Sequence, residues 1–420
     1  MAKLIIIADD FTGALDTGVQ LSKKGISTQV FVHKTLDWHA LDSNGEVLVV
    51  DTDSRHLDER QAYRRVFDIC IEAKTRGFKY FYKKTDSTLR GNIGAELSAL
   101  MDACKLDRLP FIPAYPETGR TTKKGYQYVN GVLLDQTVFA ADPLEPIKDA
   151  YIPNIIRRQS DKIVNLINES HITMGGLSSN EKGILVLDAV DKKDMERIFH
   201  LLVKQKDLTA LAGCAGFAEY LFKLYSLKTK PRKKKAVHKP ILVVSGSVND
   251  MSIKQVQYAE KAGIGSRKIL PWELMDDSYP TSLDYKSHIE AAIEGIKDNG
   301  YFILKTADKR GDIIPLKEEI EGFSKDNLYK NISGPIGHLV KEILKRVKVG
   351  TLVVFGGDTA LGIIHELGCT YIKPQYELMP GIPLSTIGSS EFNGFLITKA
   401  GGFGNETVLT DIITYVERGK

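Results

Sequence analysis

The sequence has few of the features that mark metal-binding, secreted or membrane proteins. Its cysteines lie far apart and form no CxxC motif or Cys/His cluster; they are Cys70, Cys104, Cys214 and Cys369. This spacing argues against a structural zinc site and favours free thiols in a reducing compartment. No apolar run approaches the roughly 18 residues that span a bilayer. The chain begins with a strand rather than a signal peptide, so we expect a cytoplasmic protein with no membrane partner.

Several common catalytic motifs are also absent. The sequence contains no Walker motif GxxxxGK[ST], no GxGxxG in a strand-to-helix turn and no GxSxG serine elbow. Their absence disfavours a P-loop NTPase or a dinucleotide dehydrogenase. The histidines are scattered and indicate no metal cluster. The net charge is only +4, and much of it lies in one run over 228–235, so we expect no nucleic-acid partner.

What the sequence does contain is a regular alternation of apolar β-rich runs with helical spacing. In the first half it predicts strands over 4–8, 28–32, 47–51, 80–83, 108–112 and 184–187, and helices over 60–75, 93–105, 194–206 and 216–227. In the second half it predicts strands over 241–245, 266–270, 301–305, 351–355, 383–387 and 395–398, and helices over 251–262, 285–299, 333–346 and from about 407. This alternation is typical of an α/β protein with mostly parallel sheets flanked by helices.

A basic, proline-containing stretch divides the two halves. It can be a nucleic-acid patch, but its position between two structured halves favours a solvated linker. We therefore predict two domains, each with a mostly parallel sheet flanked by helices: residues 1–228, a linker over 229–240, and residues 241–420.

Two adjacent carboxylates, Asp9 and Asp10, follow the first predicted strand. Open α/β sheets bind ligands at this carboxyl end of their strands. Adjacent acids repel each other in a low-dielectric cleft, unless a substrate hydroxyl or a cation comes to meet them. The alternative is that one of the two only caps the helix that starts near Thr12.

A second polar cluster follows the strand over 80–83. Within the loop over 84–92, Arg90 can bind a carboxylate through two N–H groups, while Lys84 and Asp86 suit hydroxyl groups, and Ser87 adds a hydroxyl of its own. The alternative is structural, because Asp86 or Ser87 could cap the next helix and Arg90 could form a surface ion pair.

A third cluster follows the strand over 108–112, in a loop whose shape is fixed by two prolines and a glycine. Arg120 in this loop is another candidate ligand for an anion. Residues 53–55 could add to the same site or form a loop ion pair. Downstream, Asn130-Gly131 predicts a hairpin turn, because Asn-Gly is the strongest short signal for one.

The second half carries three glycine-rich turns between a strand and a helix. They contain Ser245 and Ser247; then Gly356, Gly357, Asp358 and Thr359; and then Gly401, Gly402 and Gly404. Glycines let the backbone approach a phosphate without a side-chain clash, and a helix N-terminus attracts anions. Each turn alone could be a plain tight turn or a helix cap. Together they indicate a site for nucleotide phosphates.

These segments together resemble the four-carbon acid sugar kinase family. As they stand here they are ADDFTGALD, KKTDSTLRGNIGAEL, IPAYPETGRTTKKGYQYVNGV, SGS, GGDTA and KAGGFGNETVL. The resemblance covers nearly the whole chain and implies an N-terminal domain for a sugar acid and a C-terminal domain for ATP. It implies phosphorylation of the terminal hydroxyl of a four-carbon acid. The form KKTDSTLRGN, with YVNGVLL and DPLEP after it, is closer to the D-threonate and D-erythronate branch than to the 3-oxo-tetronate branch.

The resemblance implies that Ser247, the turn 356–359 and Gly402 bind the nucleotide. We expect direct in-line phosphoryl transfer, dominated by positioning and charge neutralisation. Lys84, Arg90 and Arg120 would hold the acid, and Asp10 or Asp86 would accept the proton of the attacking hydroxyl. Asp358 is a third candidate for that role and also a candidate ligand of Mg²⁺, which neutralises the phosphates.

Because the two groups of motifs lie on different predicted domains, we expect domain closure. Two other classes of function stay open, a non-catalytic sugar-acid sensor and a hydroxy-acid dehydrogenase. The oligomeric state is also open, with a homodimer as one option.

Overall fold

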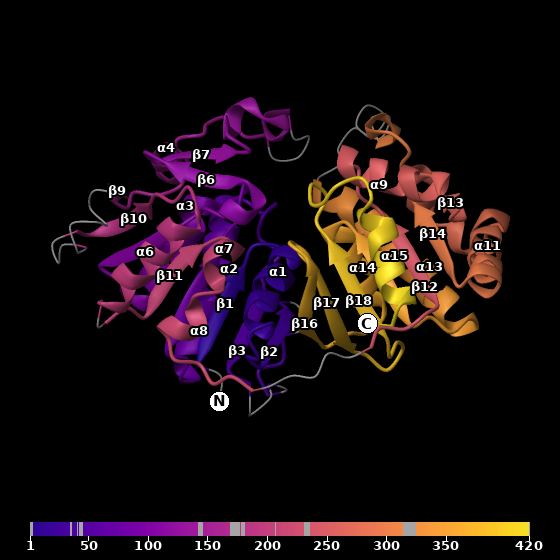
Figure 1. Ribbon diagram of the computed structural model, residues 1–420, viewed down its shortest axis with the longest axis horizontal. Helices are drawn as coiled ribbons and strands as arrows, with labels where there is room; N and C mark the ends of the chain where they lie inside the picture. Colours follow the sequence, from indigo (N-terminus) through magenta and orange to yellow (C-terminus); the bar gives the residue numbers. More distant parts are fainter. Residues whose placement is uncertain are drawn as a thin grey trace. The chain divides into compact units, whose positions relative to one another are not determined.

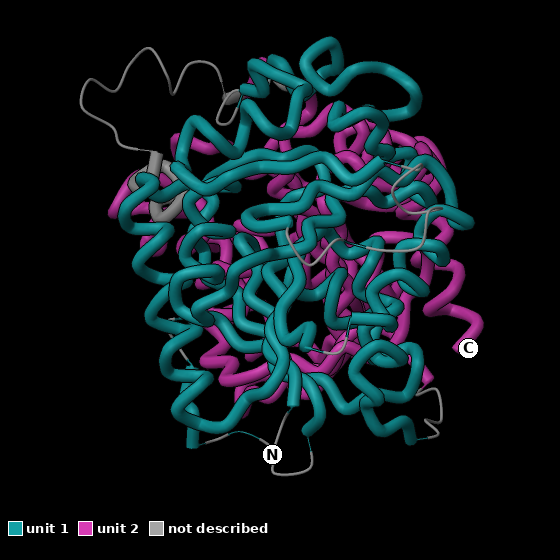
Figure 2. The backbone as a smooth tube through the Cα atoms, turned by 90° about the vertical axis from the view of Figure 1, so that its left-hand side faces the viewer, with its two compact units in different colours: residues 1–231 teal, residues 232–420 magenta. Residues whose placement is uncertain are grey.

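A computed structural model of the protein describes residues 3–33, 36–39, 41, 45–141, 146–168, 177, 181–205, 207–230, 236–313 and 325–419. The chain divides into two compact units, Met1–Pro231 and Arg232–Lys420 (Figure 2). Residues 142–145 of the DPLEP segment and residues 231–235 of the expected linker lie outside the described residues.

The first unit is built on a parallel sheet (Figure 1). Its strands run in the order β2 (Thr28–Val32), β3 (Val47–Asp51), β1 (Leu4–Ala8), β4 (Tyr80–Lys84), β11 (Ala210–Gly213), β5 (Arg108–Ile112), β10 (Gly183–Leu187) and β9 (Val164–Ile167). Each neighbouring pair in this order is parallel. Strands buried on both faces read as continuous apolar runs, and this explains why the sequence locates β1, β2, β3 and β5 at their observed bounds.

Helices and a small antiparallel sheet complete the first unit. The helices are α1 (Phe11–Ser22), α2 (Glu59–Thr75), α3 (Ile93–Cys104), α4 (Ile152–Arg157), α6 (Lys192–Val203), α7 (Ala215–Ala218) and α8 (Leu221–Leu224), with 3-10 turns η2 (Pro116–Thr118), η3 (Leu134–Gln136) and η4 (Val138–Ala141). The small sheet holds β6 (Arg120–Lys123), β7 (Tyr126–Val129) and β8 (Val132–Leu133). Asn130 and Gly131 both have positive φ between β7 and β8, as a tight hairpin turn requires.

One predicted helix of the first unit is wrong in form. The single helix expected over 216–227 is two short helices, α7 and α8. The break has a local cause: the N–H of Tyr220 donates to the carbonyl of Phe217, three residues back, which tightens the turn and ends the α-helical ladder. Ser226, with a positive φ, then ends the second helix.

The second unit has a mixed sheet. Its strands run in the order β13 (Ser266–Lys268), β14 (Tyr301–Lys305), β12 (Ile241–Ser245), β15 (Thr351–Phe355), β18 (Phe395–Lys399), β17 (Ile382–Gly388) and β16 (Tyr371–Met379). The pairs from β13 to β18 are parallel, and β17 and β16 add an antiparallel hairpin. The sequence did not predict β16, because Pro374 and polar residues interrupt its apolar pattern.

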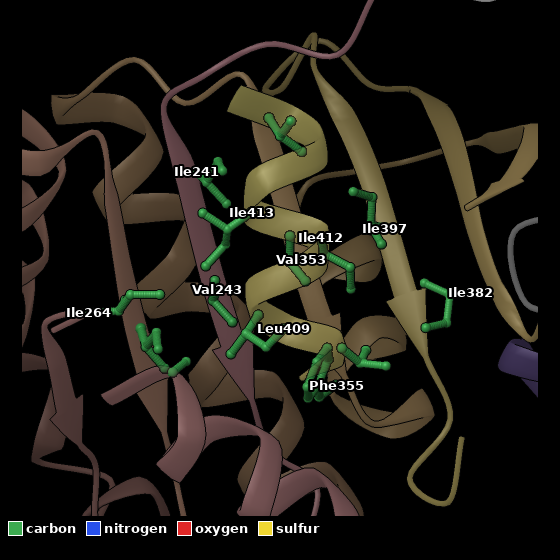
Figure 3. Close-up of a cluster of buried hydrophobic side chains, with 14 of the residues drawn as sticks. Ile241, Val243, Ile264, Val353, Phe355, Ile382, Ile397, Leu409, Ile412 and Ile413 are labelled. Atoms are coloured by element: carbon green, nitrogen blue, oxygen red, sulfur yellow. The ribbon is translucent and has the colours of Figure 1, made fainter. Parts of the chain in front are cut away.

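The helices of the second unit enclose its core. They are α9 (Asp250–Lys261), α10 (Pro271–Met275), α11 (Leu283–Asn299), α13 (Lys325–Arg346), α14 (Gly357–Glu366) and α15 (Val408–Glu417), with 3-10 turns η5 (Tyr279–Thr281) and η6 (Arg310–Ile313). Figure 3 shows Leu409, Ile412 and Ile413 of α15 on the side that faces the sheet residues Val353 and Ile397. This i, i+3, i+4 spacing is the apolar stripe of a helix packed on a sheet. None of the helices in the described part of the chain combines the length and apolarity that a membrane span requires.

Each sheet has a point where the chain reverses its direction of winding. In the first unit β1 leads to β2 and β3 on one side, and β4 then lies on the other side of β1. In the second unit β12 leads to β13 and β14, and β15 lies on the opposite side of β12. Ligands of open α/β sheets bind at such switch points, outside the carboxyl ends of the strands. We therefore expect ligand-binding sites in the loops after β1 and β4 and in those after β12 and β15.

Candidate functional site

An arginine that the sequence analysis left open lies at the centre of the first site. Arg55 follows β3 and contacts Asp9 through both Nε and a terminal nitrogen, each at 2.7 Å. The same terminal nitrogen lies 2.8 Å from Asp10 and 3.7 Å from Asp86. Three loops, after β1, β3 and β4, thus converge on one guanidinium. The signal in the sequence was the position of Arg55 just after a buried strand, but the type of residue could not show that it pairs with three carboxylates.

Asp9 and Asp10 have different roles. The Asp10 carboxylate caps α1, because it accepts from the Gly13 N–H at 3.0 Å and from the Thr12 hydroxyl at 2.8 Å. Asp10 therefore caps α1 and also contacts Arg55, whereas the Asp9 side chain is 1 % exposed and pairs with Arg55. Asp10 is 22 % exposed, which makes it the most accessible of the three carboxylates. Burial alone would raise the pKa of Asp10, but Arg55 and Lys84 hold it below its ordinary value.

Asp86 is held by the loop that it begins. Arg90 grips it with two nitrogens, at 2.8 and 3.2 Å, and Thr88 donates its hydroxyl to the same carboxylate. Burial would raise the pKa of Asp86, yet Arg90 and Arg55 keep it well below the ordinary value. The residue that caps α3 is Asn92, so neither Asp86 nor Ser87 is that cap. Ser87 is half-buried, and its backbone carbonyl accepts from Gln127.

Lys84 is buried without a hydrogen-bond acceptor among the described residues. Its side chain is 5 % exposed, and the carboxylate oxygen paired with it, Oδ1 of Asp9, lies 3.7 Å away. That oxygen is also buried and accepts no hydrogen bond within the described structure. A buried ammonium normally has its donors satisfied. An oxygen atom of a ligand within reach of Nζ would supply the acceptor that the described residues lack.

Because Gly13 has no side chain, the side chains of Asp10 and Lys84 can occupy the space next to it. A Cβ at this position would lie 2.4 Å from Oδ1 of Asp10 and 2.4 Å from Nζ of Lys84. Such distances do not occur in folded proteins, so any larger residue must displace one of the two side chains. This gives the Asp-Asp-Phe-Thr-Gly segment a physical reason for its glycine.

Arg120 interacts electrostatically with Asp86 and Arg90. It is 9 % exposed and donates to the carbonyl of Thr118. Burial lowers its pKa, with Asp86 acting to raise it and Arg90 acting to lower it. Arg120 is thus close enough to Asp86 and Arg90 for their charges to act on it, and its binding of an anion stays a prediction.

A buried ion pair that the sequence analysis missed supports these loops from behind. Lys83 and Glu96 are both fully buried, with Nζ 2.9 Å from a Glu96 oxygen. Lys83 also donates to the carbonyls of Ile7 and Lys84, and the other Glu96 oxygen accepts from the Ser54 hydroxyl. The signal was available, since Lys83 lies inside a strand and Glu96 inside an otherwise apolar helix. Nothing in the sequence shows that the two face each other.

The loops also contain backbone strain. Asp53 and Leu89 have φ of 47° and 56°, in the left-handed region that disfavours such residues. Strain of this kind persists where the surroundings impose it, and it clusters at functional sites.

In the second unit the three glycine-rich turns meet. A Cβ at Gly246 would lie 2.0 Å from Oγ1 of Thr359, and a Cβ at Gly356 would lie 3.4 Å from the backbone nitrogen of Ser247. A Cβ at Gly401 would lie 3.1 Å from the hydroxyl of Ser247. Turns separated by more than a hundred residues in the sequence are thus in contact at one edge of the sheet. The turns can come this close because glycine has no side chain at these positions.

The other predicted nucleotide residues have distinct settings. Gly402 has open space around it, whereas a Cβ at Gly404 would strike Val408 of α15 at 2.3 Å. Ser245 ends β12, is buried, and accepts from the Thr306 N–H through its carbonyl. Asp358 is exposed in the first turn of α14. The described residues contain no group of three His, Cys, Asp or Glu side chains that could hold a metal by themselves.

Comparisons with known proteins agree with this division of the chain. The family model described as a sugar-binding N-terminal domain matches residues 4–221, and that described as a nucleotide-binding C-terminal domain matches residues 242–409. The chain is 34% identical to D-threonate kinase of Salmonella typhimurium strain LT2, over 99% of this chain and 98% of that protein. It is 27% identical to D-erythronate kinase of Heliobacterium modesticaldum, over 99% of this chain and 97% of that protein.

A third relative and two solved structures extend the comparison. The 3-oxo-tetronate kinase of Haemophilus influenzae is 28% identical over 96% of this chain and 97% of that protein. A crystal structure from Salmonella typhimurium LT2 has the same fold, with a TM-score of 0.81 at 21% identity over 98% of this chain and 99% of that one. A structure from Haemophilus influenzae has a TM-score of 0.71 at 24% identity over 99% of each chain. With a family model over each unit and a relative above 30% identity over its full length, the chain belongs to the four-carbon acid sugar kinase family.

Proposed function

We propose that the protein transfers the γ-phosphate of ATP to the terminal hydroxyl of a four-carbon sugar acid, with D-threonate or D-erythronate as substrate. The 34% identity to a D-threonate kinase over nearly all of both chains supports D-threonate as the first acid to test. A 3-oxo-tetronate is the alternative within the family, supported by the 28% identity to a kinase of that name.

The Lys84 ammonium, which has no hydrogen-bond acceptor among the described residues, supports the assignment of the acid site. It is buried beside the carboxylates of Asp9 and Asp10, so donor and acceptor groups face the same space. A hydroxy acid offers both complements, a carboxylate for the cations and hydroxyls for the carboxylates. In this proposal Lys84, Arg90 and Arg120 hold the acid, and Ser87 lies at the same loop.

Asp10 is the group that we assign to the attacking hydroxyl. It is ionised at neutral pH, since its pKa lies below the already acidic ordinary value of an aspartate, and it is more exposed than Asp9 or Asp86. An ionised aspartate can orient the hydroxyl and accept its proton as the phosphoryl group arrives. Asp86 is less exposed than Asp10 and is held through both oxygens by Arg90 of its own loop, so we assign it to the positioning of that arginine.

The converging glycine turns are the proposed site for the phosphates. Backbone N–H groups at the N-terminus of α14 favour anions, and the turn geometry lets a phosphate come close. Asp358 offers one carboxylate at this edge, which fits Mg²⁺, since that ion commonly takes one or two protein carboxylates and completes its shell with phosphates and water. When bound, Mg²⁺ would supply charge neutralisation of the phosphates. That leaves Asp358 as the metal ligand in our proposal rather than the proton acceptor.

The test is ADP release with D-threonate, D-erythronate and a 3-oxo-tetronate as acceptors, for the wild type and two variants. Asp10→Asn should lower kcat by about 10²- to 10⁴-fold. Asp86→Asn should mainly raise KM for the acid, because it releases Arg90. Asp68→Asn is the matched control, since that aspartate is exposed on α2 and its ion-pair partner within the described residues is Arg64 of the same helix.

The outcomes separate the alternatives. Wild-type turnover in Asp10→Asn would exclude Asp10 as the proton acceptor. Acid binding by the wild type without any ADP release would point to a sugar-acid sensor instead. A change in nicotinamide absorbance with any of these acids would favour a dehydrogenase.

A further inference from the structure

Lys399 is a fully buried lysine whose ammonium faces backbone carbonyls rather than a carboxylate. It ends β18, and its side chain lies over the ring of Phe355 at 4.7 Å. Nζ donates to the carbonyls of Ala400 and Gly401, both at 2.9 Å, and to that of Phe403 at 3.3 Å. The hydroxyl of Ser252 on α9 lies 3.1 Å from Nζ and donates to the carbonyl of Gly401 at 3.1 Å. Lys399 therefore binds three carbonyls of the third glycine-rich turn, and Gln255 of α9 supports the turn by donating to the carbonyls of Phe403 and Asn405.

The carbonyl directions determine where the N–H groups of the turn point. In a trans peptide the C=O and the following N–H point to opposite sides. The carbonyls of Ala400, Gly401 and Phe403 face Lys399, so the N–H groups of Gly401, Gly402 and Gly404 face away from it. Within the described residues none of these three N–H groups has an acceptor. Successive N–H groups turned outward in this way form a concave site for an anion.

We propose that Lys399 is a positioning residue for the nucleotide phosphates, because its buried ammonium turns the carbonyls of residues 400–403 inward and leaves the N–H groups of the turn facing the phosphates. This inference rests on the proposed use of a nucleotide by the second unit. Lys399 does not touch the nucleotide in this arrangement. It acts through the shape and the charge of the turn.

The ammonium also couples nucleotide binding to a proton. Burial lowers the pKa of Lys399 to about 7, and no charged side chain contributes to that shift. The groups that face Nζ are the Ser252 hydroxyl from α9, the Phe355 ring from β15 and the carbonyls of its own turn. The ion pair near this turn, Lys254–Glu406, is exposed. A phosphate in front of the turn adds negative charge near Nζ and favours its protonated form, so binding above pH 7 should take up a proton.

The experiment compares the full-length wild type with Lys399→Met by titration calorimetry, using ADP with Mg²⁺ as the probe. We expect the variant to bind ADP about 10- to 100-fold more weakly. The turn would lose its hydrogen bonds to the Lys399 ammonium, and hydrogen bonds to a charged group have energies of this size. Binding of the acid to the first unit should not change. Lys254→Met is the control, because it removes an exposed lysine near the same turn and should leave ADP affinity within twofold.

A second measurement uses only the wild type, in case Lys399→Met does not fold. Titrations at pH 8 in two buffers of different ionisation enthalpy should show uptake of about 0.5–1 proton per ADP, and a merely structural lysine would show none. Uptake of no proton, or unchanged ADP affinity in a folded Lys399→Met, would overturn this inference alone. A wild type that binds no ADP would overturn the proposed function, and this inference with it.

Discussion

At the scale of single residues, the first site is defined by how closely its charged groups can approach. Arg55 brings three carboxylates to one guanidinium, and Lys84 completes the group with an ammonium that has no acceptor among the described residues. Like charges packed this densely are stable only because opposite charges lie between them. The same arrangement leaves Asp10 ionised and accessible, which is what a group facing a substrate hydroxyl needs.

Gly13 is the residue on which this spacing depends most directly. In Gly13→Ala the new methyl group would stand 2.4 Å from both Asp10 and Lys84, so one of the two must move. A displacement of about 1 Å at a reacting group costs on the order of 10²-fold in rate. We therefore expect kcat/KM for the acid to fall about 100-fold while the protein stays folded, measured by ADP release and circular dichroism.

Gly334→Ala provides the comparison for that variant. Gly334 lies in α13, and apart from its chain neighbours nothing lies within 4 Å of its Cβ position, so alanine there should leave turnover unchanged. If Gly13→Ala kept turnover within twofold of wild type, close approach at Gly13 would have no part in the site.

At the scale of elements, a buried ion pair connects strand β4 to helix α3 beneath the site. Lys83 reaches the carbonyls at the ends of β1 and β4, and Glu96 reaches Ser54 in the loop after β3. The three loops that present Asp9, Arg55 and Lys84 are thus anchored to one pair. Burying two charges is costly and stabilises a fold little by itself, so its value here is to fix the loops.

Removing one member of this pair should be costly. Lys83→Met or Glu96→Gln leaves the other group buried without its counter-charge, and each should lower the free energy of unfolding by about 3–5 kcal/mol. The double variant Lys83→Met/Glu96→Leu removes both charges, so it should lose much less stability than the sum of the single changes. Urea unfolding measures all three, with Lys79→Met at an exposed position of the same segment as control.

The double variant also separates stability from positioning. If the pair fixes the loops, the double variant should be folded and yet have a raised KM for the acid. Full activity in a stable double variant would show that the pair has no role in holding the site.

At the scale of the whole molecule, two α/β units carry two proposed sites of opposite character. Each site lies at the switch point of its own sheet, with charged side chains in the first unit and glycine-rich turns in the second. A hydroxy acid needs side chains that distinguish its carboxylate from its hydroxyls, whereas phosphates are bound well by backbone N–H groups. This division of labour matches the sugar-binding and nucleotide-binding domains of the family.

Hydrogen exchange should resolve the two sites separately. D-Threonate should slow exchange in residues 9–13 and 84–92, and ADP with Mg²⁺ should slow it in residues 245–249, 356–360 and 400–405. Binding protects amides whose donors the ligand engages or whose opening it opposes. Protection of the second-unit turns by the acid alone, or of the first-unit loops by ADP alone, would contradict the assignment of one ligand to each unit.

The sequence predicted the regular elements well where burial alone controls them. Strands such as β1, β3, β12 and β15 are buried on both faces, so their apolar runs show their ends directly. It failed where local contacts decide the outcome, as in the helix that breaks into α7 and α8 and in the strand β16. The motif loops were also located correctly, since each follows a predicted strand.

The sequence by itself determined which family the motifs resemble, the α/β class, and which loops carry the polar and glycine-rich residues. Only the tertiary structure decided which of those residues act together. Arg55, Lys83, Glu96 and Lys399 acquire their settings from partners far along the chain, and a buried charge has no function that can be read without its partners. That is why Asp9 and Asp10 look equivalent in the sequence and differ in the fold: one is buried against Arg55, and the other caps α1 and stays partly exposed.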